Sequence, residues 1–271
     1  MFSWPLTADD PVGTGPEAVA PAPVRPAVHV QGVSQVFQRG AAPVLQGVDL
    51  SVAPGEFVCL LGASGCGKST LLNLIAGLAE PTTGTIDVAV QRPALMFQEP
   101  ALLPWLTAAG NVELALRARG VARSDRREEA RRLLHLVNLD GQGEKRVHEL
   151  SGGMRQRVAL ARALAQDSSV LLMDEPFAAL DAITRDVLHE ELARLRASQS
   201  LTVVFVTHNV REAVRLGDRV VLLSSRPGRV AREYDIVIDT PRRIESPEVA
   251  RLSVEITEDL RNEIRRHGGQ S

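Results

Sequence analysis

The sequence contains little cysteine, few aromatic residues and almost no excess of charge. Two of its 271 residues are cysteine, 3% are aromatic, and the formal net charge is -2. Cys59 falls in an apolar run and Cys66 in a glycine-rich segment, so neither indicates a disulfide or a metal site, and both are interpreted as reduced thiols. The small net charge offers no overall attraction to nucleic acid, and no nucleic-acid partner is predicted.

Long hydrophobic runs are also lacking. No stretch approaches the roughly 18 consecutive apolar residues of a membrane-spanning helix, so the sequence predicts no span of its own. Residues 1–26 hold Asp9, Asp10 and six prolines, with no basic residue before Arg25. This is unlike the charged-then-apolar order of a secretory signal peptide. We expect a disordered tail rich in proline and alanine over 1–26.

The remaining composition is that of a globular α/β protein. Hydrophobic residues make up 44% and charged residues 24% of the chain, which suits one large domain or two small ones. Strands are predicted at 28–33, 48–52, 56–61, 85–90, 94–97, 170–173, 202–206, 219–224 and 234–238. Helices are predicted at 69–76, in segments between 107 and 148, and at 181–198, 209–216 and 247–267. The order predicts a mostly parallel sheet, an antiparallel β layer formed by the first two strands, and an inserted helical subdomain.

A glycine-rich motif follows the strand predicted at 56–61. Residues 62–69 read GASGCGKS and fit the pattern G-x-x-x-x-G-K-S/T, in which backbone N–H groups surround phosphate oxygens. In that pattern Lys68 reaches the β- and γ-phosphates and Ser69 binds Mg²⁺. A glycine-rich turn that matched this pattern by chance would not be expected to lie between a strand and a helix, as this segment does. The candidate ATP-binding residues of this loop are Gly62, Ala63, Ser64, Gly65, Cys66, Gly67, Lys68, Ser69 and Thr70.

Two further motifs follow in a characteristic order. Residues 150–154 read LSGGM, and a later hydrophobic run ends in Asp174 and Glu175. Alone, the acidic pair could be a helix N-cap, and Ser151 could cap an ordinary helix. Two glycines in a first helical turn would each cost up to about 1 kcal/mol, which an ordinary helix does not explain. Together with the phosphate loop, these motifs resemble the ATP-binding subunit of ABC transporters over residues 27–225.

The resemblance implies ATP and Mg²⁺ as ligands and assigns roles around the γ-phosphate. Glu175 would polarise the attacking water, and His208 would hydrogen-bond the γ-phosphate. Mg²⁺ would be held by Ser69 and Gln98 directly and by Asp174 through water. Without the family pattern, Gln98 would be unremarkable, and His208 could equally be a capping or surface histidine.

The resemblance also implies that one ATP site needs two chains. Ser151 and the amides of Gly152 and Gly153 would cap the γ-phosphate bound by a second copy in a head-to-tail dimer, and Asp181 would contact that copy. Met154 stands where the family usually has Gln, so it cannot return a capping-box hydrogen bond, but the phosphate contact rests on Ser151 and on backbone.

Two aromatic side chains have open interpretations. Phe37 stands where the family stacks an aromatic ring on adenine, and packing against the core is the alternative. Trp105 follows Gln98 closely, where relatives form a groove for a membrane partner. A role in the core is the alternative for this residue as well.

The resemblance divides the chain into the tail at 1–26, an ATPase domain at 27–225, and a strand with an amphipathic helix at 226–271. Within the ATPase domain, 27–98 and 167–225 would form the nucleotide-binding core and 99–166 the helical and signature subdomain. The implied partners are a second copy, a transmembrane permease dimer and, indirectly, an extracytoplasmic solute-binding protein. The implied location is peripheral, on the cytoplasmic face of the inner membrane.

Four short segments resemble the corresponding sequences of the nitrate, sulfonate and taurine importer branch of the family. They lie at 96–105, at Met154, at 176–177 and at 225–229. Aliphatic sulfonate import is the first choice, with nitrate or taurine import as alternatives. A soluble ABC ATPase that acts on ribosomes or DNA ends would favour tandem cassettes or basic arms, and the chain has one cassette. A P-loop GTPase would carry an N/T-K-x-D base reader, which is absent, and neither a GTPase nor a small-molecule kinase explains LSGGM.

Overall fold

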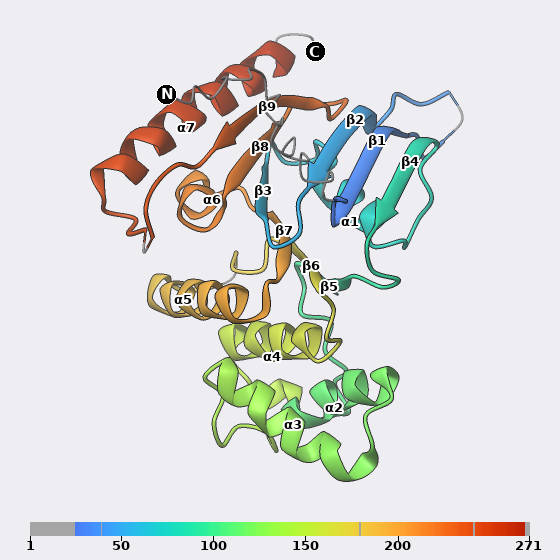
Figure 1. Cartoon of the computed structure of the whole chain (residues 1–271), viewed down its shortest axis with the longest axis vertical. Helices are drawn as coiled ribbons and strands as arrows, with labels where there is room; N and C mark the ends of the chain where they lie inside the picture. Colours follow the sequence, from blue (N-terminus) through green and yellow to red (C-terminus); the bar gives the residue numbers. More distant parts are fainter. Residues whose placement is uncertain (1–24, 39, 179, 241, 269–271) are drawn as a thin grey trace, which may run out of the picture.

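A computed structural model describes residues 25–38, 40–178, 180–240 and 242–268, which form two β-sheets and the helices around them (Figure 1). Most of the predicted tail at 1–26 lies outside these residues. The strands are β1 (Val28–Gln35), β2 (Leu45–Val52), β3 (Phe57–Leu61), β4 (Thr83–Val88), β5 (Ala94–Met96), β6 (Val170–Asp174), β7 (Thr202–Val206), β8 (Arg219–Leu223) and β9 (Val230–Asp235). The helices are α1 (Lys68–Ile75), α2 (Ala108–Arg119), α3 (Arg123–Leu136), α4 (Gly152–Leu164), α5 (Ala182–Gln199), α6 (Val210–Leu216) and α7 (Pro247–Gly268), with a short 3₁₀ turn at Val147–Glu149.

The larger sheet carries the phosphate loop. Its strand order is β5-β6-β7-β3-β8-β9, and all neighbours are parallel except β8 and β9. Every residue of β3 and β7 is buried, which is why these strands read as continuous apolar runs rather than as alternating ones. Because parallel strands end at the same sheet edge, the segments after β3, β5, β6 and β7 meet there. The prediction of a mostly parallel sheet is confirmed.

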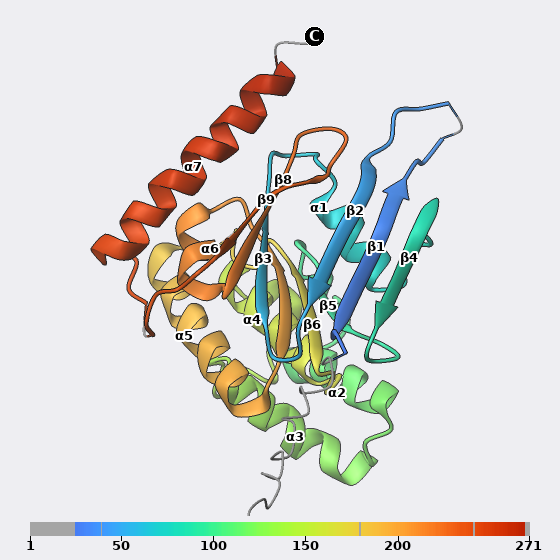
Figure 2. The same cartoon turned by 45° about the horizontal axis from the view of Figure 1, so that its top comes forward.

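The smaller sheet contains the two strands of the predicted antiparallel layer and a third strand, β4, which the sequence did not assign to it, in the order β2-β1-β4. Its inward side chains, such as Val28 and Val30, share one apolar cluster with Val58 of β3 and Leu71 of α1. In both views this sheet lies on one side of the larger sheet and α7 on the other (Figures 1 and 2).

The helical segment forms the end of the molecule away from the antiparallel sheet and α7, with α4 between the strands and the pair α2 and α3 (Figure 1). Thr107 caps α2 by accepting a hydrogen bond from the Gly110 amide, and Gly120 ends the helix in the left-handed conformation. Among the described residues, no helix combines the length and apolar character that crossing a bilayer requires. The proposed subdomain boundaries at 98, 166 and 225 stay predictions.

The strand predicted at 234–238 is wrong in position, because β9 occupies 230–235. Pairing with β8 begins directly after the turn at Pro227 and Gly228, with Val230 opposite Leu223 and Tyr234 opposite Val220. Tyr234 and Ile236 are both buried, so the alternation of buried and exposed residues continues past the end of β9. The sequence prediction followed this alternation and therefore placed the strand too late in the chain. The helix predicted at 247–267 is confirmed as α7.

Candidate functional site

The phosphate loop connects β3 to α1. The side chain of Lys68 is buried, and its Nζ lies 2.9 Å from the carbonyl oxygens of Gly62 and Ala63. Gly67 has φ +103°, and a Cβ at this position would lie 2.6 Å from Cδ2 of Leu45. A side chain at this position would therefore be strained by the positive φ and would have to displace the Leu45 side chain of β2. This tight loop, followed at once by a helix N-terminus, is a suitable cradle for phosphate.

The loop is supported from behind by residues that the sequence did not single out as functional. The Gly228 amide donates to the Val44 carbonyl at 2.8 Å, and a Cβ on Gly228 would lie 2.1 Å from the carbonyl oxygen of Cys66. Nε of Arg226 donates to the Gly65 carbonyl at 2.9 Å. Residues 225–229, whose sequence indicated only a subfamily, therefore pack against the phosphate loop.

Cys66 lies within the loop and its side chain is buried. Burial raises the pKa of the Cys66 thiol, and the nearby Lys68 ammonium opposes that rise. The buried position agrees with the interpretation of this residue as a reduced thiol.

Ser69 and Asp174 meet at the carboxyl ends of β3 and β6. The Ser69 hydroxyl donates a hydrogen bond to the Asp174 carboxylate. Burial raises the pKa of Asp174, the hydrogen bond from Ser69 opposes it, and the neighbouring charge of Glu175 raises the pKa further. No group of three or more His, Cys, Asp or Glu side chains arranged for a metal occurs among the described residues. A hydroxyl and one carboxylate fit Mg²⁺ that takes its other ligands from phosphates and water.

Glu175 and His208 come together although they lie 33 positions apart. Nδ1 of His208 is 3.0 Å from Oε2 of Glu175, and because an ionised carboxylate only accepts hydrogen bonds, Nδ1 carries the proton. Glu175 has φ +43°, an unusual conformation for a residue with a side chain, and its amide donates to the Val206 carbonyl at 2.9 Å. Both side chains border a small pocket of about 40 Å³, which Thr207 also lines.

Gln98 lies just beyond β5 at the same sheet edge, with an exposed side chain. Its carbonyl accepts a hydrogen bond from Nε2 of Gln156 at 3.3 Å. Arg162, also on α4, donates to the carbonyls of Pro100 and Ala101 at 2.7 Å each. The segment after Gln98 is therefore fastened to the helix that begins at the LSGGM motif, and neither Gln156 nor Arg162 stood out in the sequence.

The two aromatic residues with open interpretations are both solvent-exposed. Phe37 is 66% exposed in the connection between β1 and β2, and Trp105 is also 66% exposed. A role in the core is therefore wrong for both. The Trp105 carbonyl accepts a hydrogen bond from the guanidinium of Arg146, which fixes its backbone while the indole faces solvent.

Ser151 caps α4, because its side-chain oxygen accepts a hydrogen bond from the Met154 amide at 3.2 Å. A Cβ on Gly153 would approach Leu180 at 3.3 Å, beside the start of α5, where Asp181 is the N-cap. Hydrogen bonds donated by the hydroxyl and the amide of Thr184 lower the pKa of Asp181. Within the described part of the chain, no hydrogen bond or ion pair joins residues 150–154 to the phosphate loop.

Apart from Phe37 in the connection between β1 and β2, the predicted site residues fall into two sets. The first gathers at the carboxyl edge of the larger sheet and comprises the loop from Gly62 to Thr70 together with Gln98, Asp174, Glu175 and His208. The second, Ser151, Gly152, Gly153 and Asp181, lies at the starts of α4 and α5.

The sequence matches known proteins over most of its length. A family model described as ABC transporter matches residues 45–178. An aliphatic sulfonates import ATP-binding protein of Mesorhizobium japonicum is 44% identical over 253 residues, which cover 89% of this chain and 94% of that protein. A taurine import ATP-binding protein of Burkholderia pseudomallei is 47% identical over 215 residues, which cover 76% of this chain and 83% of that protein.

The fold matches a solved cassette structure. A dimeric ATP-binding cassette in a post-hydrolysis state, bound to ADP and Pi, superposes with a TM-score of 0.71 at 33% identity. The match covers 78% of this chain and 100% of that chain. The prediction of an α/β ATPase core with an antiparallel layer and a helical subdomain is confirmed.

Proposed function

The chain belongs to the ABC transporter family as an ATP-binding subunit with ATPase activity, and we propose that it powers an import complex for organic sulfonates. The observation that carries the catalytic part is the contact between Glu175 and His208, at the sheet edge that also holds Lys68 and the Ser69–Asp174 pair. Such an arrangement suits transfer of a γ-phosphoryl group to water.

The loop residues would bind the phosphates of ATP, and Phe37 would stack on the adenine. Lys68, which now donates to two loop carbonyls, would turn toward the β- and γ-phosphate oxygens. Mg²⁺, held by Ser69 and Gln98 and through water by Asp174, would neutralise charge on those oxygens.

Glu175 would act on the attacking water. Its carboxylate would accept the proton as the water oxygen bonds to the γ-phosphorus and ADP leaves. To keep its Nδ1–H bond to Glu175 and also donate from Nε2 to a γ-phosphate oxygen, His208 would have to carry a proton on each ring nitrogen, as an imidazolium. The positive φ of Glu175 supports this role, because strained backbone of this kind is often found at catalytic positions.

Two copies would assemble head to tail around ATP. Ser151 and Gly152 are exposed at the start of α4, so a second chain can reach them. There, Ser151 and the amides of Gly152 and Gly153 would cap the γ-phosphate held by the partner copy. Asp181 would contact that copy as well. The dimeric cassette of similar fold supports this arrangement.

A permease dimer would bind beside Trp105. Trp105 is exposed and follows Ala101, which α4 holds through Arg162, by four positions, so movement of α4 would be passed along the chain to a partner seated there. We infer a peripheral position on the cytoplasmic face of the inner membrane and, through the permease, an extracytoplasmic solute-binding protein as the source of substrate.

Organic sulfonates are the proposed cargo because the relatives above are named for import of aliphatic sulfonates and of taurine, which is itself an aminoalkyl sulfonate. A strain that lacks the chain should lose uptake of radiolabelled alkanesulfonate or taurine. The wild-type chain should restore that uptake, and Glu175→Gln should not. Unchanged sulfonate uptake in the deletion strain, or loss of nitrate uptake alone, would overturn the cargo assignment.

A further inference from the structure

A buried polar cluster lies between α5 and α6, directly behind the end of β7. His189 of α5 is 1% exposed and Glu212 of α6 is 5% exposed. Nε2 of His189 lies 2.8 Å from Oε1 of Glu212, and the other carboxylate oxygen of Glu212 accepts a hydrogen bond from the Thr207 hydroxyl. Thr207 immediately precedes His208. A continuous chain of hydrogen bonds therefore runs from α5 to the residue next to His208.

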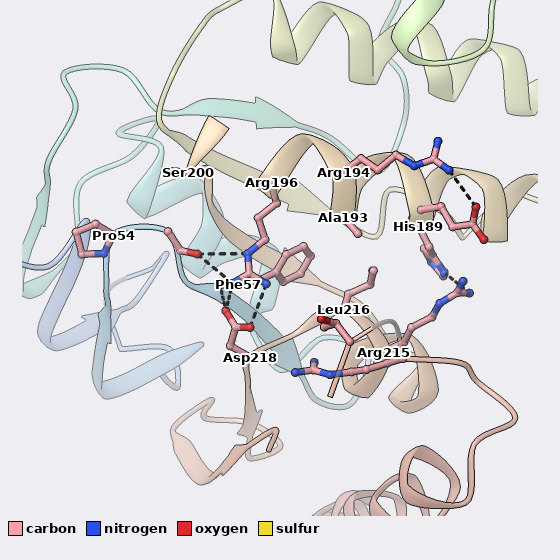
Figure 3. A pocket seen from close by; sticks show the side chains of 14 residues that line it. Pro54, Phe57, His189, Ala193, Arg194, Arg196, Ser200, Arg215, Leu216 and Asp218 are labelled. Atoms are coloured by element: carbon pink, nitrogen blue, oxygen red, sulfur yellow. Dashed lines mark hydrogen bonds and ion pairs between the residues drawn. The ribbon is translucent and has the colours of Figure 1, made fainter. Parts of the chain in front are cut away.

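The partners of His189 fix its tautomer. Nη1 of Arg215 lies 3.3 Å from Nδ1 of His189, and a guanidinium only donates hydrogen bonds. Nδ1 must therefore accept, so the proton sits on Nε2 and is donated to Glu212. Figure 3 shows His189 and Arg215 side by side at the wall of a cavity of about 870 Å³, which lies toward the amino ends of the strands. The hydrogen-bond chain leads from this wall toward the opposite edge of the sheet.

His189 also touches the segment that follows Glu175. Its ring meets the ring of Phe177 edge-on, with centroids 5.2 Å apart and an interplanar angle of 64°. Phe177 is 1% exposed and stands two residues after Glu175. One buried imidazole thus contacts the chain beyond Glu175 directly and the chain before His208 through Glu212.

The start of α6 belongs to the same cluster. The Asn209 amide donates to the Thr207 hydroxyl oxygen at 3.0 Å, and the Asn209 side chain accepts from the amide of Glu212 at 3.3 Å. His208 therefore lies between two residues whose positions the cluster sets. A buried carboxylate that lost its donors would be costly, so Glu212 needs both His189 and Thr207.

We propose that His189 is a positioning residue for ATP hydrolysis. Through the Nε2–H bond to Glu212 it holds Thr207, and through ring contact it holds Phe177, so that His208 and Glu175 keep their mutual geometry. In this role His189 would act only through Thr207 and Phe177 and would not contact the reacting atoms. This inference rests on the roles proposed above for Glu175 and His208.

The test compares two substitutions in the full chain. His189→Phe keeps an aromatic ring against Phe177 and removes both ring nitrogens, whereas the amide of His189→Gln can still donate to Glu212. Displacing a reacting group by a fraction of an ångström to 1 Å costs roughly ten- to hundredfold in rate, so H189F should lower kcat by about tenfold or more. The KM for ATP should change by less than about twofold, because binding residues are untouched. H189Q should recover most of the lost kcat.

A matched control separates positioning from loss of packing. Leu192 is fully buried on the same helix and makes no hydrogen bond to the cluster through its side chain. Leu192→Ala should lower the melting temperature at least as much as H189F does and leave kcat within about twofold of wild type. Equal loss of kcat in L192A and H189F at similar melting temperatures would overturn the proposal.

Thr207 provides an independent arm that does not depend on H189F folding. Thr207→Val should lower kcat as H189F does, and Thr207→Ser, which keeps the hydroxyl, should not. If both residues act through one hydrogen-bond chain, the H189F/T207V double variant should have the kcat of the lower single variant within about twofold, and multiplied losses would contradict the shared chain.

Glu175→Gln and His208→Ala in the same assay separate the two proposals. If they abolish turnover while H189F and T207V do not, only the positioning role fails, and if they retain turnover, the catalytic roles proposed for Glu175 and His208 fail.

Discussion

Nδ1 of His208 lies 3.0 Å from Oε2 of Glu175, across the carboxyl ends of two adjacent parallel strands. The parallel pairing of β6 and β7 places Asp174 opposite Val206, so the residues that follow each strand are brought to the same edge. The contact joins the proposed general base to the proposed γ-phosphate ligand before any partner chain takes part.

Replacing Glu175 with Gln keeps the size of the side chain and removes its ability to accept a proton. We expect ATP hydrolysis to fall by roughly 10²- to 10⁴-fold, the range for loss of a general base, while ATP still binds. Single-turnover hydrolysis and equilibrium binding of labelled ATP measure the two quantities separately. Turnover at the wild-type rate would remove Glu175 from its proposed role.

Gly228→Ala should disturb the phosphate loop from behind. The added Cβ would lie 2.1 Å from the Cys66 carbonyl, so the loop or the segment at 227–229 must move. We expect weaker ATP binding and a loss of about 1 to 3 kcal/mol in the free energy of unfolding, measured by calorimetric titration and denaturant melts. Gly143→Ala, whose Cβ would meet Ala109 at an ordinary 3.4 Å, is the control and should change neither quantity appreciably.

Asp174→Asn should raise the melting temperature of the nucleotide-free protein and abolish its Mg²⁺-dependent turnover. Burial raises the pKa of Asp174 above its ordinary value of 3.8, so the folded state holds the proton more tightly than the unfolded state does. Stability is therefore lost as the pH rises from 3.8 through the raised folded pKa, and at pH 7 the full cost of ionisation is present.

We accordingly expect the nucleotide-free Asp174→Asn protein to melt at a higher temperature than wild type at pH 7. The difference should shrink as the pH is lowered through the raised pKa. Mg²⁺-dependent turnover should be lost at every pH. A lower melting temperature at pH 7, measured by scanning calorimetry without nucleotide, would show that burial of the charge is not the dominant cost at this position.

Trp105→Ala should weaken capture of the permease without affecting the nucleotide site. Exposed tryptophan at an interface often contributes 2 kcal/mol or more, so affinity for the cognate permease in detergent should fall by about 30-fold. Val237→Ala is the control, because Val237 is 92% exposed on the C-terminal segment. Equal capture by W105A and wild type, at equal ATP affinity, would place the permease elsewhere.

The central strands and the phosphate loop could be predicted because each is indicated by the residues of one continuous segment. β3, β6 and β7 read as apolar runs since both faces of their sheet are covered, and the loop that begins at Gly62 stands out because phosphate binding constrains adjacent residues. Glycine, lysine and serine at fixed spacing are a local pattern, so one sequence is enough to recognise them.

The remainder depends on contacts between distant segments. Arg226 and Gly65 are 161 positions apart, and nothing local indicates that one supports the other. The sequence did not single out His189 within the helix predicted at 181–198, and only the packing of α5 on α6 brings it to Glu212. The late placement of the strand at 234–238 has the same origin, because the register with β8, rather than the apolar pattern, sets where β9 begins.

The central claim is that ATP is bound between two opposed copies, with the phosphate loop of one facing Ser151 of the other. Sedimentation velocity of the Glu175→Gln chain, with and without ATP and Mg²⁺, tests it most directly. We expect the mass of one chain, 29.3 kDa, without nucleotide and twice that mass with it. Adding Ser151→Arg should abolish the shift while ATP remains bound. A chain that binds ATP stoichiometrically and stays monomeric, or one that dimerises equally well with Ser151→Arg, would contradict the account.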